Sequence, residues 1–164
     1  MLKLFIQLNY RHLYTLSTTP TTNTTIIIIN NFIKKQQGGS TLKIICNQKL
    51  LANKIGIVQK AINSKTTLDL LKGVLIVTKQ DEIILKGYDL EIGIESHVPA
   101  EVIQEGSIVI NSKLFGDIIR KLPDSFVEIE TDEDNNVYIN CLNSKFKIKG
   151  DSAKEYPQIP DVNE

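Results

Sequence analysis

GSIVINSKLFGDIIRKLP, residues 106–123, is the stretch from which the fold can be predicted. It has the pattern of a short apolar strand, a polar capping residue and an amphipathic helix of about three turns. A weaker copy lies 64 positions earlier, where Asn47-Gln48-Lys49-Leu50-Leu51 corresponds to Asn111-Ser112-Lys113-Leu114-Phe115. Because an internal repeat fixes the architecture of a chain, we expect two similar units with their helices side by side.

The residues around the earlier copy complete one unit. Apolar residues at helical spacing predict a helix over residues 48–63, namely Leu51, Ile55, Val58 and Ile62. Strands are predicted at 42–46, 74–78, 82–86 and 90–95. In the last of these, Leu90, Ile92 and Ile94 alternate with polar residues or glycine, which is typical of a half-buried strand.

The second unit repeats this plan and sets the fold class. A strand at 107–110 and a helix at 112–122 are followed by strands at 126–131, 137–141 and 145–149. The predicted class is α+β, a doubled βαβββ unit in which two helices pack on one side of a mostly antiparallel sheet. Residues 155–160 are expected to be extended and to begin a linker.

Composition indicates one soluble globular domain, with 164 residues, 41% apolar and 23% charged. The net charge of zero is unevenly distributed. Residues 1–41 carry four Lys or Arg and no acid, so residues 42–164 hold 19 − 4 = 15 basic and 19 acidic side chains, a net of −4. Binding of nucleic acid by the folded part therefore requires locally grouped cations. Cys46 and Cys141 lack CxxC spacing, which favours buried free thiols in a reducing cytosol over a disulfide.

Residues 1–41 differ from the rest of the chain. They contain no apolar run of the roughly 18 residues that a membrane helix needs, so no membrane partner is expected. The absence of acids fits a transit peptide or a disordered tail. Our preferred hypothesis is that the segment is a mis-translated upstream region and that the protein begins at Leu42, because codons for Gly38-Gly39 can form a ribosome-binding sequence.

The residues that could carry chemistry form no recognisable set. Glu91 and Glu95 have no histidine beside them, and His97 is followed by Val98-Pro99 without a nucleophile. No Gly-Lys-Ser/Thr follows Gly38-Gly39, so no phosphate loop is present. We therefore expect no catalytic residue, no metal site and no cofactor.

Five blocks of residues 42–164 resemble the first domain of the bacterial DNA polymerase III β subunit, the sliding clamp: Ile57–Ile62, Ser64–Leu68, Gly87–Ile92, Gly106–Asp124 and Ala153–Pro160. They occur in the family's order, and residues 1–41 show no such match. The resemblance implies the DNA clamp fold and a cytoplasmic bacterial protein. It also implies a non-catalytic processivity factor, an accessory subunit of a DNA-directed DNA polymerase holoenzyme.

Clamps of this family have three such domains per chain, and two chains close head to tail around duplex DNA. The resemblance therefore implies that a second protomer, the clamp loader and DNA polymerase III are partners. The loader and polymerase would bind the second and third domains, which we expect to be missing from residues 42–164. A scaffold or interaction module that uses the same fold without contacting DNA is the alternative.

The family's helices line the hole of the ring, which gives residue-level expectations. Lys65 occupies the position of a basic residue that meets DNA, and five helix cations are expected to face DNA as well: Lys49, Lys60, Lys113, Arg120 and Lys121. Taken singly, each is an ordinary solvated surface residue.

The family's dimer contact uses the last strand of this domain. It places Lys145, Phe146 and Ile148 at the joint, with Lys113 nearby. For Phe146 and Ile148, packing into the protein's own core is the alternative, and the lysines could simply protect an edge strand.

Overall fold

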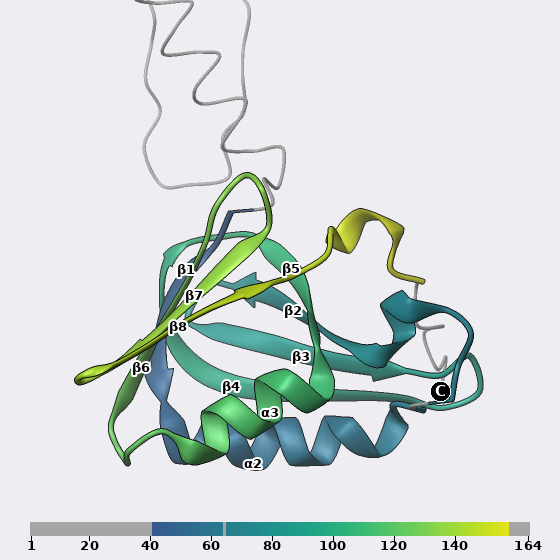
Figure 1. Cartoon of the computed structure of the whole chain (residues 1–164), viewed down its shortest axis with the longest axis horizontal. Helices are drawn as coiled ribbons and strands as arrows, with labels where there is room; N and C mark the ends of the chain where they lie inside the picture. The colour runs from purple at the N-terminus through teal and green to yellow at the C-terminus, as the bar shows by residue number, and fades with distance from the viewer. Residues whose placement is uncertain (1–40, 64, 158–164) are drawn as a thin grey trace, which may run out of the picture. The chain divides into compact units, whose positions relative to one another are not determined.

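Two βαβββ units follow one another along the chain, as the repeat predicts (Figure 1). The computed structural model describes residues 41–63 and 65–157, so the hypothesis about residues 1–41 lies outside the described residues except for Thr41. The first unit consists of β1 (Lys43–Asn47), α2 (Gln48–Val58), β2 (Gly73–Lys79), β3 (Glu82–Tyr88) and β4 (Gly93–Gln104). The second consists of β5 (Ser107–Asn111), α3 (Ser112–Lys121), β6 (Phe126–Thr131), β7 (Asn136–Cys141) and β8 (Ser144–Lys149).

All eight described strands form one antiparallel sheet in the order β5-β2-β3-β4-β1-β6-β7-β8. The first strand of each unit crosses to the other unit, because β1 pairs with β6 and β5 pairs with β2. Within the single sheet, β5 of the second unit thus lies beside the three last strands of the first unit, and β1 of the first unit lies beside the three last strands of the second. The predicted α+β class with a doubled unit is confirmed.

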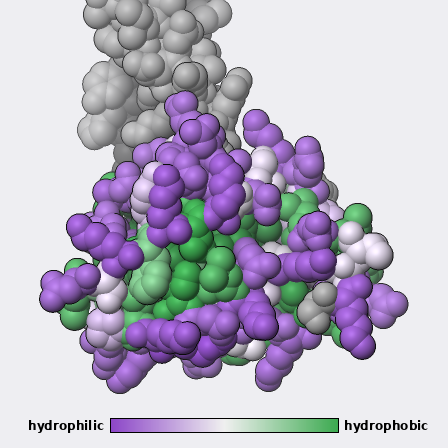
Figure 2. All heavy atoms as spheres, viewed as in Figure 1, coloured by the Kyte–Doolittle hydropathy of each residue, from purple (hydrophilic) through white to green (hydrophobic). Residues whose placement is uncertain are grey.

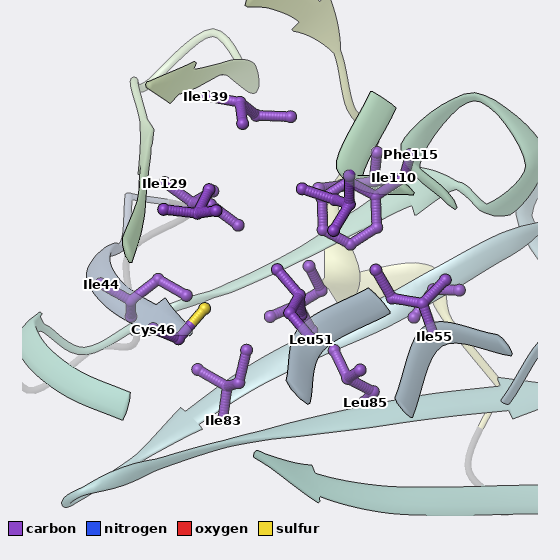
Figure 3. Packing of buried hydrophobic residues seen from close by; sticks show 14 of the residues in the cluster. Ile44, Cys46, Leu51, Ile55, Ile83, Leu85, Ile110, Phe115, Ile129 and Ile139 are labelled. Atoms are coloured by element: carbon purple, nitrogen blue, oxygen red, sulfur yellow. The ribbon is translucent and has the colours of Figure 1, made fainter. Parts of the chain in front are cut away.

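Both helices cover the same face of the sheet (Figure 1). Leu51 and Ile55 of α2 and Phe115 of α3 point into one core with strand residues, and all three are 0% exposed (Figure 3). The sheet supplies Ile44, Ile83, Leu85, Ile110, Ile129 and Ile139 to this cluster. Burial of a large apolar side chain contributes about 1.5–3 kcal/mol, so this shared core is the main reason that the helices stay on the sheet.

The two helices begin with the same cap. The Asn47 Oδ1 accepts from the Leu50 N–H at 3.1 Å, and the Asn111 Oδ1 accepts from the Leu114 N–H at 3.0 Å. Each side chain satisfies one backbone donor that the first turn leaves without a helical partner. The repeat therefore extends from sequence to cap geometry.

The predicted strand at 90–95 was wrong in its position. Asp89 Oδ1 accepts from the N–H groups of Glu91 and Ile92, and this local turn prevents a strand there. The strand β4 instead starts at Gly93 and runs to Gln104. Pro99 is tolerated because β4 pairs with β3 up to this residue and with β1 beyond it.

The helix predicted over 48–63 is shorter than expected. The α-helix α2 ends at Val58 and tightens into a 3-10 turn over Gln59–Ala61.

The two cysteines are free and buried, as predicted. Burial raises the pKa of Cys46 to about 12 and also raises the pKa of Cys141, since a thiolate is poorly solvated among apolar neighbours. Both thiols therefore belong to the core.

Candidate nucleic-acid surface and protomer joint

Two glutamines fix the helices against each other. Gln48 Nε2 at the start of α2 donates to the Ile119 carbonyl near the end of α3, at 2.6 Å. Gln59 Nε2, just after α2, donates to the Ser112 carbonyl at the start of α3, also at 2.6 Å. The helices are therefore antiparallel neighbours. Gln48 was not among the residues predicted from the sequence, although its position on the apolar stripe of Leu51 and Ile55 marks it as a buried polar residue.

The helix cations singled out from the sequence all lie on the solvent side of this pair. Because the apolar stripes of α2 and α3 face the sheet, the exposed residues opposite them include Lys49, Lys60, Lys113, Arg120 and Lys121. We call this set the helix surface. Lys65 is exposed in the loop after the 3-10 turn, where its N–H donates to Asn63 Oδ1 at 2.9 Å.

Acidic neighbours partly neutralise the helix surface. Lys49 Nζ lies 2.6 Å from Asp124 Oδ2, and Arg120 Nη2 lies 2.7 Å from Asp117 Oδ1. Arg120 Nη1 also donates to Gln59 Oε1 at 3.2 Å, which holds the guanidinium over the seam between the helices. Within the described residues, the other cations form no ion pair: Lys60, Lys65, Lys113 and Lys121. Neither aspartate was predicted from the sequence, although Asp117 stands at i,i+3 spacing from Arg120, which favours an ion pair on a helix.

Strand β8 is an edge strand, as predicted. Phe146 and Ile148 lie opposite Ile139 and Val137 of β7, whose side chains are fully buried. Facing residues of antiparallel strands point to the same side, so both apolar residues of β8 face the core. Ile148 packs partly into that core, whereas Phe146 remains 39% exposed. Packing into the domain's own core thus explains the apolar side chain of Ile148 better than that of Phe146.

An apolar area is open to solvent between β8 and α3 (Figure 2). Beyond β8 the chain turns to β5, where Val109 and Asp151 exchange backbone hydrogen bonds of 3.0 and 2.8 Å. This bridge is the only pairing between the two ends of the sheet in the described part of the chain. The sheet therefore almost closes on itself but leaves the β8 edge accessible.

The described residues give no support to other kinds of site. None of their His, Cys, Asp and Glu side chains group in a way that could hold a metal ion. The expectation that Glu95 has no histidine beside it was wrong, because His97 Nε2 lies 3.3 Å from Glu95 Oε1 on the outer side of the sheet, and His97 Nδ1 lies 3.1 Å from Glu82 Oε1. Among the described residues, no serine, threonine or cysteine is hydrogen-bonded to this histidine. No described helix has the length and apolar character required to cross a membrane.

The comparisons with known proteins agree with this geometry. A family model described as the N-terminal domain of the DNA polymerase III beta subunit matches residues 42–160. A Beta sliding clamp of Bacillus subtilis is 34% identical over 131 residues, covering 75% of this chain and 35% of that protein. One from Staphylococcus aureus is 38% identical over 112 residues, covering 63% of this chain and 30% of that protein. The solved structure of the Bacillus subtilis DNA polymerase sliding clamp superposes with a TM-score of 0.73 at 33% identity, covering 76% of this chain and 35% of that chain.

The doubled βαβββ unit with paired helices on one face of the sheet is the fold of the solved sliding clamp, so the class of protein is a clamp domain. The matched region covers most of the chain. The chain belongs to the DNA polymerase III beta subunit family, and residues 42–160 correspond to its N-terminal domain. It spans about a third of the length of the curated relatives it matches.

Proposed function

We propose that this domain works as part of a sliding clamp, a ring that encloses duplex DNA and keeps DNA polymerase III on its template. The observation that supports this function best is the helix surface. Residues 42–164 have a net charge of −4, which by itself disfavours binding to DNA. The exposed cations of the two helices lie on the side away from the sheet, so they offer a local positive surface. The role is mechanical, with no reaction catalysed and no cofactor needed.

The proposed contact with DNA is electrostatic and independent of sequence. Lys60, Lys65, Lys113 and Lys121 would approach phosphates, which carry no base information. Lys49 and Arg120 would contribute less, because each shares its charge with an aspartate. Individually weak contacts suit a ring, since a protein that encloses DNA stays on it without tight binding.

The proposed joint lies at the β8 edge. Lys145, Phe146 and Ile148 would meet an edge strand of a second protomer, so that two protomers close head to tail. The partly exposed Phe146 and the open apolar area beside α3 support this placement. In the whole cytoplasmic protein, the clamp loader and the polymerase would bind outside this domain.

The helix surface can be tested by the salt dependence of binding to a duplex oligonucleotide, followed by fluorescence anisotropy at low ionic strength. K60Q/K121Q is expected to reduce the slope of log affinity against log salt by about 2, since each lost phosphate contact contributes about 0.9. The matched control is K79Q/K154Q, which removes two exposed cations away from the helix surface. All variants retain residues 1–41, so any binding by that basic segment is common to them.

A scaffold of the same fold that does not touch DNA is the competing function. It predicts that both double variants lose equally little affinity, and that Lys65 does not crosslink to duplex DNA even at low salt. A selective loss in K60Q/K121Q would exclude the scaffold and support the clamp.

A further inference from the structure

The guanidinium of Arg120 is held from two directions on the solvent side of the helix pair. Its Nη1 donates to Gln59 Oε1 at 3.2 Å, and its Nη2 donates to Asp117 Oδ1 at 2.7 Å. A guanidinium carries five N–H donors, so the donors that these two bonds leave over have no acceptor among the described residues. The side chain is also 45% exposed. Arg120 is therefore fixed in direction and still has donors free for a ligand.

The carboxamide of Gln59 has a single orientation that satisfies both of its neighbours. Its Nε2 donates to the Ser112 carbonyl at 2.6 Å, while its Oε1 accepts from Arg120. A carbonyl oxygen cannot donate and a guanidinium cannot accept, so an amide turned the other way would lose both bonds. The bond to the first residue of α3 thus aims the Gln59 oxygen at Arg120.

Gly116 in the middle of α3 supplies the space in which these two side chains lie. A Cβ at this position would be 2.7 Å from Gln59 Nε2 and 2.9 and 3.1 Å from Nη1 and Nη2 of Arg120. Glycine destabilises a helix interior relative to alanine, and the φ of Gly116 is not positive, so the backbone itself does not require glycine. The absence of a side chain at Gly116 is explained by the two groups that lie over it.

We propose that Gln59 and Gly116 are positioning residues that hold the Arg120 guanidinium as a preoriented contact for a phosphate of duplex DNA. The planar fork of an arginine matches two phosphate oxygens, whereas a lysine ammonium is a point charge on a flexible stem. Arg120 shares its charge with Asp117, so its contribution to the helix surface is directional, while the lysines contribute charge. The inference rests on the proposed function and deepens it by naming the residues that orient one contact.

Binding of the full chain to a duplex oligonucleotide at low ionic strength, followed by fluorescence anisotropy, tests the proposal. R120Q is expected to weaken binding roughly threefold, which is the scale of one exposed ionic contact. G116A and Q59L leave every charge in place, yet each should weaken binding to a similar extent because the guanidinium is no longer held. Neither change should weaken binding further when it is added to R120Q. A merely structural role of these residues would instead weaken binding equally with and without Arg120.

The matched control is G56A, which adds the same methyl group to the interior of α2. A Cβ at Gly56 meets nothing within 4 Å, so this variant should bind duplex DNA like the unaltered chain. The atoms that a Cβ at Gly116 would displace are the ends of two flexible side chains, so α3 itself should stay intact in G116A. Circular dichroism establishes that each variant is folded.

The proposal is overturned if G116A and Q59L bind duplex DNA as tightly as the unaltered chain, or if they weaken binding equally in the R120Q background. K60Q/K121Q, measured in the same series, separates this failure from a failure of the proposed function. A loss of affinity in K60Q/K121Q alone would reject the positioning role and leave the clamp function standing. No loss in any of these variants would reject both.

Discussion

Ser96 and Phe146 occupy equivalent places in the two units but meet different surroundings. Ser96 on β4 lies opposite the buried Leu85, and Phe146 on β8 lies opposite the buried Ile139. The small polar residue is 6% exposed, whereas the large apolar one is 39% exposed. From residue type alone, the phenylalanine would be expected to be the more buried of the two. The position of each residue in the sheet therefore decides how much of its side chain is exposed.

The difference arises from what the chain does after each hairpin. Strand β4 has 12 residues, so its second half continues past β3 to pair with β1 and joins the two units. Strand β8 has 6 residues and is followed by a single bridge to β5. The same βαβββ plan thus produces an interior strand in one unit and an accessible edge in the other. The proposed joint lies where the repeat is incomplete.

The contrast between core and edge predicts the largest effect. Phe115→Ala removes a fully buried ring and should lower the free energy of unfolding by about 3–5 kcal/mol. Phe146→Ala should cost about 1 kcal/mol, because much of its ring is already in contact with water. Urea unfolding of the two variants checks this. Equal losses would show that Phe146 serves the core of this domain and would remove it from the joint.

A change at Gly150 tests how the edge is held in place. A Cβ there would lie 2.9 Å from both the Val109 carbonyl oxygen and Ile108 Cγ1. Gly150→Val should therefore displace the bridge between Val109 and Asp151 and destabilise the domain by about 1–3 kcal/mol. Hydrogen exchange should accelerate at the amides of these two residues. If their protection is unchanged, the bridge is not what fixes the end of β8.

Removal of the N-terminal cap should reduce the stability of the domain by a similar amount in both units. Asn47→Ala and Asn111→Ala each remove one side-chain acceptor from a first turn, and each should cost about 1 kcal/mol. Asn→Asp at either position keeps an acceptor and should retain most of the stability, as measured by thermal unfolding. A large inequality between the two alanine variants would mean that the units differ in their helices as well as in their last strands.

The smallest effect concerns the thiol of β1. The pKa of Cys46 is about 12 in the folded chain against an ordinary value of 9.0, because burial disfavours the thiolate. The stabilisation is fully present below pH 9 and is lost as pH rises towards 12, since the unfolded thiol ionises first. The loss should stay below about 1 kcal/mol up to pH 9.5. The free energy of unfolding of the unaltered chain should fall by this amount relative to that of Cys46→Val as the pH is raised to 9.5. A difference between the two proteins that does not change with pH would contradict the raised pKa.

The sequence predicted the elements well where a pattern is local. The 64-residue spacing between Asn47 and Asn111 identified both caps and the duplication, and strand β6 was predicted with its observed bounds. It failed at Leu90 and Ile92, because the alternation of apolar residues there competes with hydrogen bonds from the Asp89 side chain. The helix cations could be selected, and the i,i+3 spacing of Asp117 and Arg120 could have indicated their ion pair. The pair of Lys49 with Asp124 joins residues far apart in the chain and could not be foreseen from spacing.

By itself, the sequence determined the doubled unit, the apolar stripes and the alternation of β8, since each depends on residues within one or two turns or along one strand. Only the tertiary structure decided that β1 crosses to β6, that Gln48 and Gln59 join the helices, and how much of Phe146 on β8 stays exposed. The edge position of β8 was expected from the sequence, but which strands the other elements pair with was not. These features depend on contacts between residues far apart in the chain, and the hydrophobic pattern of a strand is the same whichever neighbour it pairs with.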